Sequence, residues 1–198
     1  MSYRVNEVFY SLQGEGARAG SANVFVRFSG CNLSCRREVE GFDCDTEFTS
    51  GRTLDLDALQ LELKPTAAPG VGLILTGGEP TLQIDAELIQ MVRALGFDPI
   101  CVETNGLKDI TLDVNWVSCS PKTAEHTLAL RHADELRYVR RHGMGLPRPT
   151  IEARWRYISP AWGTDGIDAG DLAWCVRLVK ENPEWRLSIQ QHKTWGVR

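Results

Sequence analysis

The chain has 198 residues, of which 42% are hydrophobic, so its composition fits a globular protein with a sizeable core and excludes a disordered one. No apolar run approaches the roughly 20 residues of a membrane-spanning helix, and polar residues interrupt the N-terminus where a signal peptide would be apolar. The net charge of −4 gives no general basis for nucleic-acid binding. We therefore expect one cytoplasmic domain over residues 1–198, with no membrane or nucleic-acid partner.

Apolar, β-prone runs recur along the chain, and polar loops that contain glycine or proline follow them. Strands are predicted at residues 5–10, 23–28, 71–75, 100–102, 114–119, 154–158 and 185–189. Residues 136–141 fit either a strand or part of a helix, and they lie in the least readable segment, residues 123–150. The glycines of residues 11–16 fit a plain hairpin turn, or a loop that brings the backbone close to a ligand.

Three segments have the spacing of helices, at residues 54–64, 85–95 and 171–181. Gly96 follows the second of them where a C′ glycine belongs. Strands that alternate with helices predict an α/β fold with a mostly parallel sheet, shaped as a partial barrel. In such folds the loops after the strands form the site, so we expect the chemistry on one face.

Three of the six cysteines lie close together, in the spacing C-x3-C-x8-C at Cys31, Cys35 and Cys44. In a reducing compartment such a group indicates metal binding before disulfides. An iron–sulfur cluster with one open iron, a zinc ion with a distant fourth ligand, and unmetallated thiols all remain open from the spacing alone. The other cysteines, at positions 101, 119 and 175, lie in apolar contexts where cysteine behaves as a small hydrophobe.

Two charged features stand out among the apolar strands. Arg27 lies inside the predicted strand 23–28, so its side chain either faces solvent or pairs with a buried group. A basic cluster comprises Arg137, Arg140, Arg141, His142 and Arg148. Because Glu135 and Glu152 flank it, we interpret this cluster as a solvated face or a local anion site rather than a nucleic-acid groove.

The cysteine group, followed by Thr76-Gly77-Gly78-Glu79-Pro80, resembles the radical S-adenosylmethionine superfamily. The order and spacing of five further segments resemble the 7-carboxy-7-deazaguanine synthase family within it. These segments are residues 12–16 (LQGEG), 44–46 (CDT), 103–106 (ETNG), 120–122 (SPK) and 185–193 (WRLSIQQHK). The resemblance extends from about residue 3 to residue 198.

The resemblance implies a shortened (β/α) barrel of the radical S-adenosylmethionine type, usually a homodimer. It implies a [4Fe–4S] cluster, S-adenosylmethionine, Mg²⁺ and an external electron donor of the flavodoxin kind. In this family one electron from the cluster cleaves S-adenosylmethionine to a 5′-deoxyadenosyl radical. The radical abstracts hydrogen from 6-carboxy-5,6,7,8-tetrahydropterin, which contracts, loses ammonia and becomes 7-carboxy-7-deazaguanine, a precursor of queuosine and related 7-deazapurines.

The resemblance also implies roles for individual residues. Cys31, Cys35 and Cys44 would hold the cluster, and the hydroxyl of Thr46 would bind Mg²⁺, a hard cation that prefers oxygen. The expected contacts to S-adenosylmethionine are Asp43, Asp45, Gly78, Ser120, Pro121, Lys122, Ser159, Pro160, Ala161 and Trp162. The expected contacts to the substrate are Leu12, Gln13, Gly14, Arg27, Thr76 and the terminal carboxylate of Arg198.

Three positions depart from the family pattern. The superfamily's usual spacing is C-x3-C-x2-C, so we interpret residues 36–41 as an insertion, which adds less than about 1 kcal/mol of loop-closure entropy. Ser159-Pro160 replaces the usual Gln-Pro, and Gln191 replaces the usual threonine before His192. Competing hypotheses are a glycyl-radical enzyme activase, a non-catalytic zinc- or cluster-binding module, and a relative that has lost catalysis.

Overall fold

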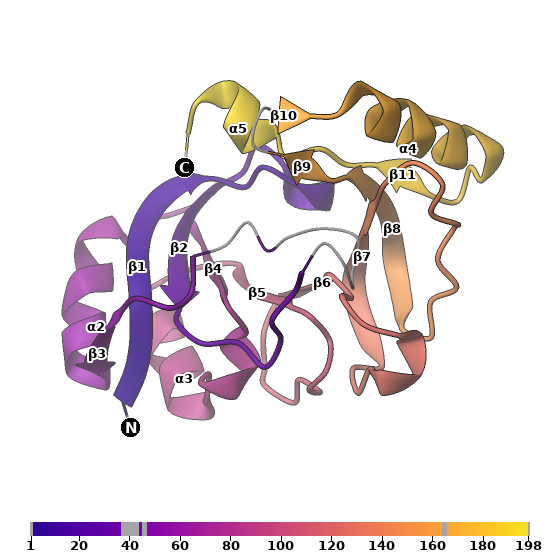
Figure 1. Ribbon diagram of the computed structural model, residues 1–198. Helices are drawn as coiled ribbons and strands as arrows, with labels where there is room; N and C mark the ends of the chain where they lie inside the picture. Colours follow the sequence, from indigo (N-terminus) through magenta and orange to yellow (C-terminus); the bar gives the residue numbers. More distant parts are fainter. Residues whose placement is uncertain (1, 37–43, 45–46, 164–165, 198) are drawn as a thin grey trace.

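A mostly parallel sheet forms the centre of the molecule. The computed structural model describes residues 2–36, 44, 47–163 and 166–197. Within this part of the chain the main sheet has nine strands, in the order β11-β8-β7-β6-β5-β4-β2-β1-β3 (Figure 1). A separate two-stranded sheet pairs β9 (Trp162–Gly163) with β10 (Gly166–Ile167).

Seven of the nine strands run parallel, as the sequence predicts. They are β2 (Ala22–Phe28), β4 (Gly72–Gly77), β5 (Ile100–Thr104), β6 (Trp116–Cys119), β7 (His132–Arg140), β8 (Glu152–Pro160) and β11 (Arg186–Leu187). The unpredicted part is an antiparallel edge, in which β1 (Ser2–Leu12) pairs with β2 on one side and with β3 (Arg52–Asp55) on the other. The ambiguous segment 136–141 proves to belong to β7, because its register with β8 extends from His132 to Arg140.

The predicted helices are present, with short 3₁₀ turns at the bends. These helices are α2 (Leu56–Leu63), α3 (Ala86–Ala94) and α4 (Ala169–Glu181), and a further short helix, α5 (Gln191–Trp195), was not predicted. The 3₁₀ turns are η1 (Gly16–Arg18), η2 (Lys64–Thr66), η3 (Pro80–Leu82) and η4 (Glu125–Thr127). Helix α2 begins two residues later than predicted because Leu54 and Asp55 pair with β1, and the Asp55 carboxylate caps the helix at the Ala58 N–H. Gly96 has a φ of +93°, as expected of a C′ glycine.

The two-residue period of the strands separates a core face from a site face. On β2, Val24, Val26 and Phe28 are fully buried in the core beneath α2 and α3, whereas Phe25 and Arg27 point to the opposite side. Figure 1 shows α2 and α3 outside the curved sheet near β1 to β5, with α4 beside β8 and β11. The opposite, inner side is therefore the side on which polar groups can gather.

Three cysteines outside the predicted cluster are buried, as the sequence predicts. Cys101 is on the inner side beside Phe25, whereas Cys119 and Cys175 belong to the core beneath α4. Burial raises the pKa of Cys101 to about 12 and that of Cys175 to about 11. At neutral pH these thiols are protonated and act as small apolar side chains.

Candidate active site

The carboxyl ends of the parallel strands surround one cavity of about 340 Å³. Fifteen of the sequence-predicted site residues line it: Leu12, Gln13, Gly14, Arg27, Cys31, Cys35, Cys44, Thr76, Gly78, Ser120, Lys122, Ser159, Pro160, Ala161 and Trp162. Pro121 does not line this cavity but a second one, which shares Lys122 with the first. Four predicted residues lie outside the described residues: Asp43, Asp45, Thr46 and Arg198.

The three clustered cysteines share the rim of this cavity with Leu33. Burial raises the pKa of the Cys31 thiol, the Leu33 N–H at 3.4 Å from its sulfur lowers it, and the Glu79 carboxylate raises it again. A bound metal would favour the thiolate form of Cys31 against these effects. Among the residues that the structure describes, no three His, Cys, Asp or Glu side chains are close enough together to hold a single metal ion. Three thiols around one cavity fit a larger, polynuclear group with three thiolate ligands better than one closed zinc ion.

The base of the cysteine loop is closed by contacts that the sequence did not predict. The Gly30 N–H donates to the Phe48 carbonyl at 2.7 Å, so the two ends of the loop meet. Both oxygens of the Glu47 carboxylate accept hydrogen bonds, including those from the Thr49 and Ser50 N–H groups at 2.7 and 2.9 Å. Asn6 of β1 donates to the same carboxylate. The segment 47–50 after the third cysteine is thus anchored to β1.

Gly77 and Gly78, at the end of β4, allow the start of the cysteine loop to pack closely against the sheet. A Cβ at Gly77 would lie 2.3 Å from the Phe28 carbonyl oxygen, and a Cβ at Gly78 would lie 2.0 Å from that of Gly30. Gly77 also has a φ of +121°, which favours glycine. The Gly78 N–H donates to the Phe28 carbonyl at 3.0 Å, and the Glu79 N–H donates to the Gly30 carbonyl at 2.9 Å. These backbone groups hold the chain immediately before Cys31.

Glu79, the acidic residue of the segment 76–80, points into the protein. Its side chain is fully buried and accepts hydrogen bonds from the Thr81 N–H and hydroxyl at 3.1 and 2.6 Å. It also accepts from the Thr104 hydroxyl at 2.7 Å and the Asn105 N–H at 2.8 Å. Glu79 therefore joins the loop after β4 to the loop after β5, which is a structural role.

We expect Glu79→Ala to lower the free energy of unfolding by about 3 kcal/mol or more, because four buried donors lose their acceptor. Glu181→Ala is the matched control, since Glu181 is exposed and pairs with Arg177 one turn away on α4, where the expected loss is below about 0.5 kcal/mol. Urea denaturation of both variants measures the difference. Equal losses would contradict the structural role of Glu79.

Arg27 faces the cavity from the end of β2. Its Nε lies 2.9 Å from Oε1 of Glu7 on β1, directly across the antiparallel pair, and its guanidinium lies 5.7 Å from the centre of the Phe9 ring. Both partners of the ion pair keep about a quarter of their side-chain surface exposed. A cation that lines the cavity and remains partly exposed suits an anionic group of a ligand.

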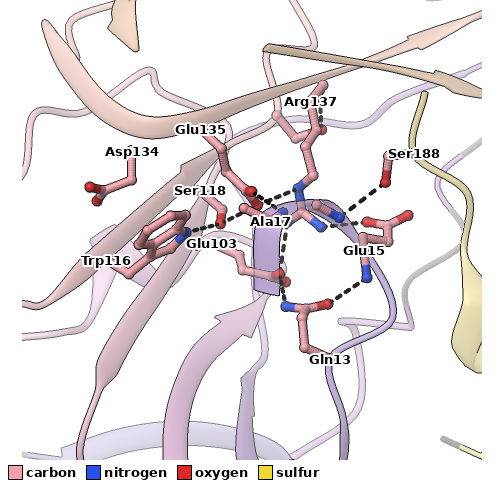
Figure 2. Close-up of polar contacts among 12 residues, drawn as sticks. Gln13, Glu15, Ala17, Glu103, Trp116, Ser118, Asp134, Glu135, Arg137 and Ser188 are labelled. Carbon is pink, nitrogen blue, oxygen red and sulfur yellow. Dashed lines mark hydrogen bonds and ion pairs between the residues drawn. The ribbon is translucent and has the colours of Figure 1, made fainter. Parts of the chain in front are cut away.

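A buried arginine on β7, Arg137, also lines the cavity, and Figure 2 shows its surroundings. The Nη1 of Arg137 lies 2.5 Å from Glu15, its Nη2 lies 2.7 Å from Glu103, and its Nε lies 3.5 Å from Glu135. Burial disfavours the charged guanidinium, but Glu103, Glu15 and Glu135 together raise the Arg137 pKa above its ordinary value. For the basic cluster the sequence left open a solvated face or a local anion site, and the solvated face is wrong for Arg137, which is 5% exposed.

Glu103 connects this arginine to two predicted substrate residues. Burial alone would raise the pKa of Glu103, but Arg137 and hydrogen bonds from Gln13 and Thr76 hold it below its ordinary value. Gln13 Nε2 donates to one carboxylate oxygen and the Thr76 hydroxyl donates to the other, both at 2.9 Å. Glu103 therefore lines the cavity as a carboxylate, a feature that the sequence analysis missed.

The glycines of residues 11–16 prove to allow close packing as well as a turn. A Cβ at Gly14 would lie 2.0 Å from Nδ1 of His192, and a Cβ at Gly16 would lie 2.3 Å from Oε1 of Glu135. The Gln191 N–H donates to the Gly14 carbonyl at 3.0 Å, which joins α5 to the loop. Gly14 and Gly16 thus bring the N-terminal loop against the C-terminal segment at the cavity.

The sequence of this chain is similar to the sequences of known proteins. A family model described as "4Fe-4S single cluster domain" matches residues 12–122. A protein of Bradyrhizobium diazoefficiens named 7-carboxy-7-deazaguanine synthase is 40% identical over 217 aligned positions, which cover all of both chains. A Bacteroides thetaiotaomicron protein of the same name is 36% identical over 198 positions, again over the whole of both chains.

The fold has a counterpart among solved structures. The structure titled "Crystal structure of QueE from Escherichia coli" superposes with a TM-score of 0.71, covering 96% of this chain and 94% of that one. The two sequences are 20% identical, so this likeness bears on the fold. It agrees with the predicted partial barrel.

Proposed function

The chain belongs to the 7-carboxy-7-deazaguanine synthase family of radical S-adenosylmethionine enzymes, and from this premise we propose that the cavity at the strand ends is its active site. It is a lyase that uses a [4Fe–4S] cluster and S-adenosylmethionine to convert 6-carboxy-5,6,7,8-tetrahydropterin to 7-carboxy-7-deazaguanine with loss of ammonia, in 7-deazapurine biosynthesis. One observation supports this location of the active site: the residues predicted to bind the cluster, the cofactor and the substrate line the same cavity.

Cys31, Cys35 and Cys44 would hold the cluster at the rim of the cavity. When bound, the cluster supplies the electron that reductive cleavage of S-adenosylmethionine requires. Gly78, Ser120, Lys122 and the segment 159–162 are the residues that would contact S-adenosylmethionine. Ser159 supports this assignment although it replaces the family's usual glutamine, since its buried hydroxyl has no hydrogen-bond partner among the described residues.

The substrate would lie between the N-terminal loop and the end of β4. Arg27 would bind the carboxylate of the pterin, and the polar groups of Gln13 and Thr76 would face its ring. Leu12 and Gly14 line the same wall. We also propose that the Thr46 hydroxyl binds Mg²⁺ and that the terminal carboxylate of Arg198 reaches the substrate; both residues lie outside the described residues.

The cellular setting is a further part of the proposal. The chain would act in the cytoplasm as one domain and as a homodimer, and would receive electrons from a flavodoxin-like donor. Among the helices that the structure describes, none has the length and apolarity to cross a membrane.

Anaerobic reconstitution with iron and sulfide tests this function. We expect the reconstituted protein, given S-adenosylmethionine, a reductant, Mg²⁺ and 6-carboxy-5,6,7,8-tetrahydropterin, to release 7-carboxy-7-deazaguanine and one ammonia per turnover. Omission of Mg²⁺ should slow the reaction. This omission tests the proposed Mg²⁺ site separately from the rest of the proposed function. No deazaguanine product from protein with an intact cluster would defeat the proposed function.

A further inference from the structure

The contacts of Arg137 point to a role beyond stability. We propose that Arg137 is a positioning residue, which fixes the substrate-facing groups of three separate chain segments through Glu103, Glu15 and Glu135. The proposal rests on the proposed function in so far as Gln13 and Thr76 face the substrate. Arg137 itself acts through these carboxylates.

The first step is the fixed orientation of the Gln13 side chain. Its Nε2 donates to Glu103 at 2.9 Å, and its Oε1 accepts from the Glu15 N–H at 3.0 Å. Gln13 is 7% exposed, and these two contacts fix the orientation of its side-chain amide. Arg137 contacts both carboxylates, Glu103 and Glu15, that flank Gln13 (Figure 2).

The second step is the anchoring of the loop that carries Gln13. The Ala17 N–H donates to Oε2 of Glu135 at 2.8 Å, and the Gly16 N–H donates to the Ser188 hydroxyl at 3.0 Å. Glu135 is 1% exposed and also accepts from Ser118 at 2.8 Å. The Glu135 carboxylate lies beside Nε of Arg137, so the guanidinium holds the carboxylate that binds the Ala17 N–H of this loop.

The third step is a question of charge. Glu15, Glu103 and Glu135 converge from the loop after β1, from β5 and from β7, and would repel one another without a shared cation. The planar guanidinium presents donors in several directions and reaches all three, whereas the ammonium of a lysine is a single point charge. Arginine is therefore the residue type that this site requires.

The test compares Arg137→Met and Arg137→Lys with Arg140→Met. Arg140 is the matched control because it lies on the same strand, donates to the Gly145 and Val139 carbonyls, and is not itself one of the residues that line the active-site cavity. We expect Arg137→Met to raise KM for the tetrahydropterin, and Kd for fluorescent 6-carboxypterin, ten-fold or more, with Kd for S-adenosylmethionine and iron content within two-fold of wild type. Arg137→Lys should recover part of the loss, since one carboxylate regains a cation.

A second readout needs no substrate. Hydrogen exchange of the Glu15 and Ala17 amides, whose acceptors are Gln13 and Glu135, should quicken in Arg137→Met and stay unchanged in Arg140→Met. If wild type makes no product, the proposed function fails, while this exchange pattern still decides the positioning role. Unchanged exchange of both the Glu15 and Ala17 amides in Arg137→Met would overturn the inference. So would an Arg137→Met variant that loses affinity for S-adenosylmethionine as much as for the pterin.

Discussion

Cys31→Ser is expected to abolish turnover and to lower the iron and sulfide content of the reconstituted protein. The serine hydroxyl is a hard, protonated ligand where the cluster requires a soft thiolate, and Cys31 is one of three thiols at the cavity rim. Replacing residues that merely support metal ligands costs about 10- to 100-fold in activity, so loss of a ligand itself should exceed about 100-fold. Iron and sulfide analysis, together with the rate of product release, measures the effect.

The matched control is Cys175→Ala, which removes a thiol from the core beneath α4. The Cys175 sulfur contacts the Arg140 carbonyl at 3.5 Å and does not line the active-site cavity. We expect this variant to lose about 1 kcal/mol of stability through the small void, and to keep its iron and its turnover. A Cys31→Ser protein with the iron and sulfide of wild type would contradict the assignment of this thiol.

Much of the site was predictable because local patterns define it. The strand 71–75 is a continuous apolar run, and the polar residues that follow it could be placed at the edge where parallel strands end. The same reasoning placed Ser120 and Ser159 correctly at the cavity, although they are distant in sequence. A residue that directly follows a parallel strand of an α/β fold can therefore be expected near the active site, whatever its distance in sequence from the other site residues.

The carboxylate network was not predictable from local patterns, because its members come from distant segments. Glu103 and Arg137 lie on different strands, and Glu15 belongs to the N-terminal loop. A usable signal existed, since Arg137 alternates with the buried Leu136 and Tyr138 and must therefore face the other side of the sheet. The neighbouring basic residues obscured this alternation.

Glu79 illustrates a different limit of the sequence. A carboxylate after two glycines suits a ligand's donors and equally suits the N–H groups of its own loop. The choice depends on Thr104 and Asn105 of the next loop, which donate to it. Only the packing of the two loops against each other decides between the two roles.

Gly78→Ala should reduce turnover by about 100-fold or more through displacement of the cysteine loop. The added Cβ would lie 2.0 Å from the Gly30 oxygen and 3.2 Å from Cβ of Cys31, and the nearest neighbour is backbone that cannot rotate away. Relief requires the segment before Cys31 to move by about 1 Å, and a misplacement of about 1 Å in an active site costs about 100-fold. The crowding should also destabilise the fold by about 1–3 kcal/mol.

Gly145→Ala is the control for this substitution, because its added Cβ would meet nothing within 4 Å. Measurements of Kd for S-adenosylmethionine, iron content and product rate should all change in Gly78→Ala and none in Gly145→Ala. The pattern also differs from that expected for Arg137→Met, which weakens pterin binding and leaves the cluster intact. The two substitutions therefore separate the groups that position the cysteine loop from those that orient the substrate. A Gly78→Ala enzyme with wild-type rates would show that the cysteine loop can shift without loss of activity.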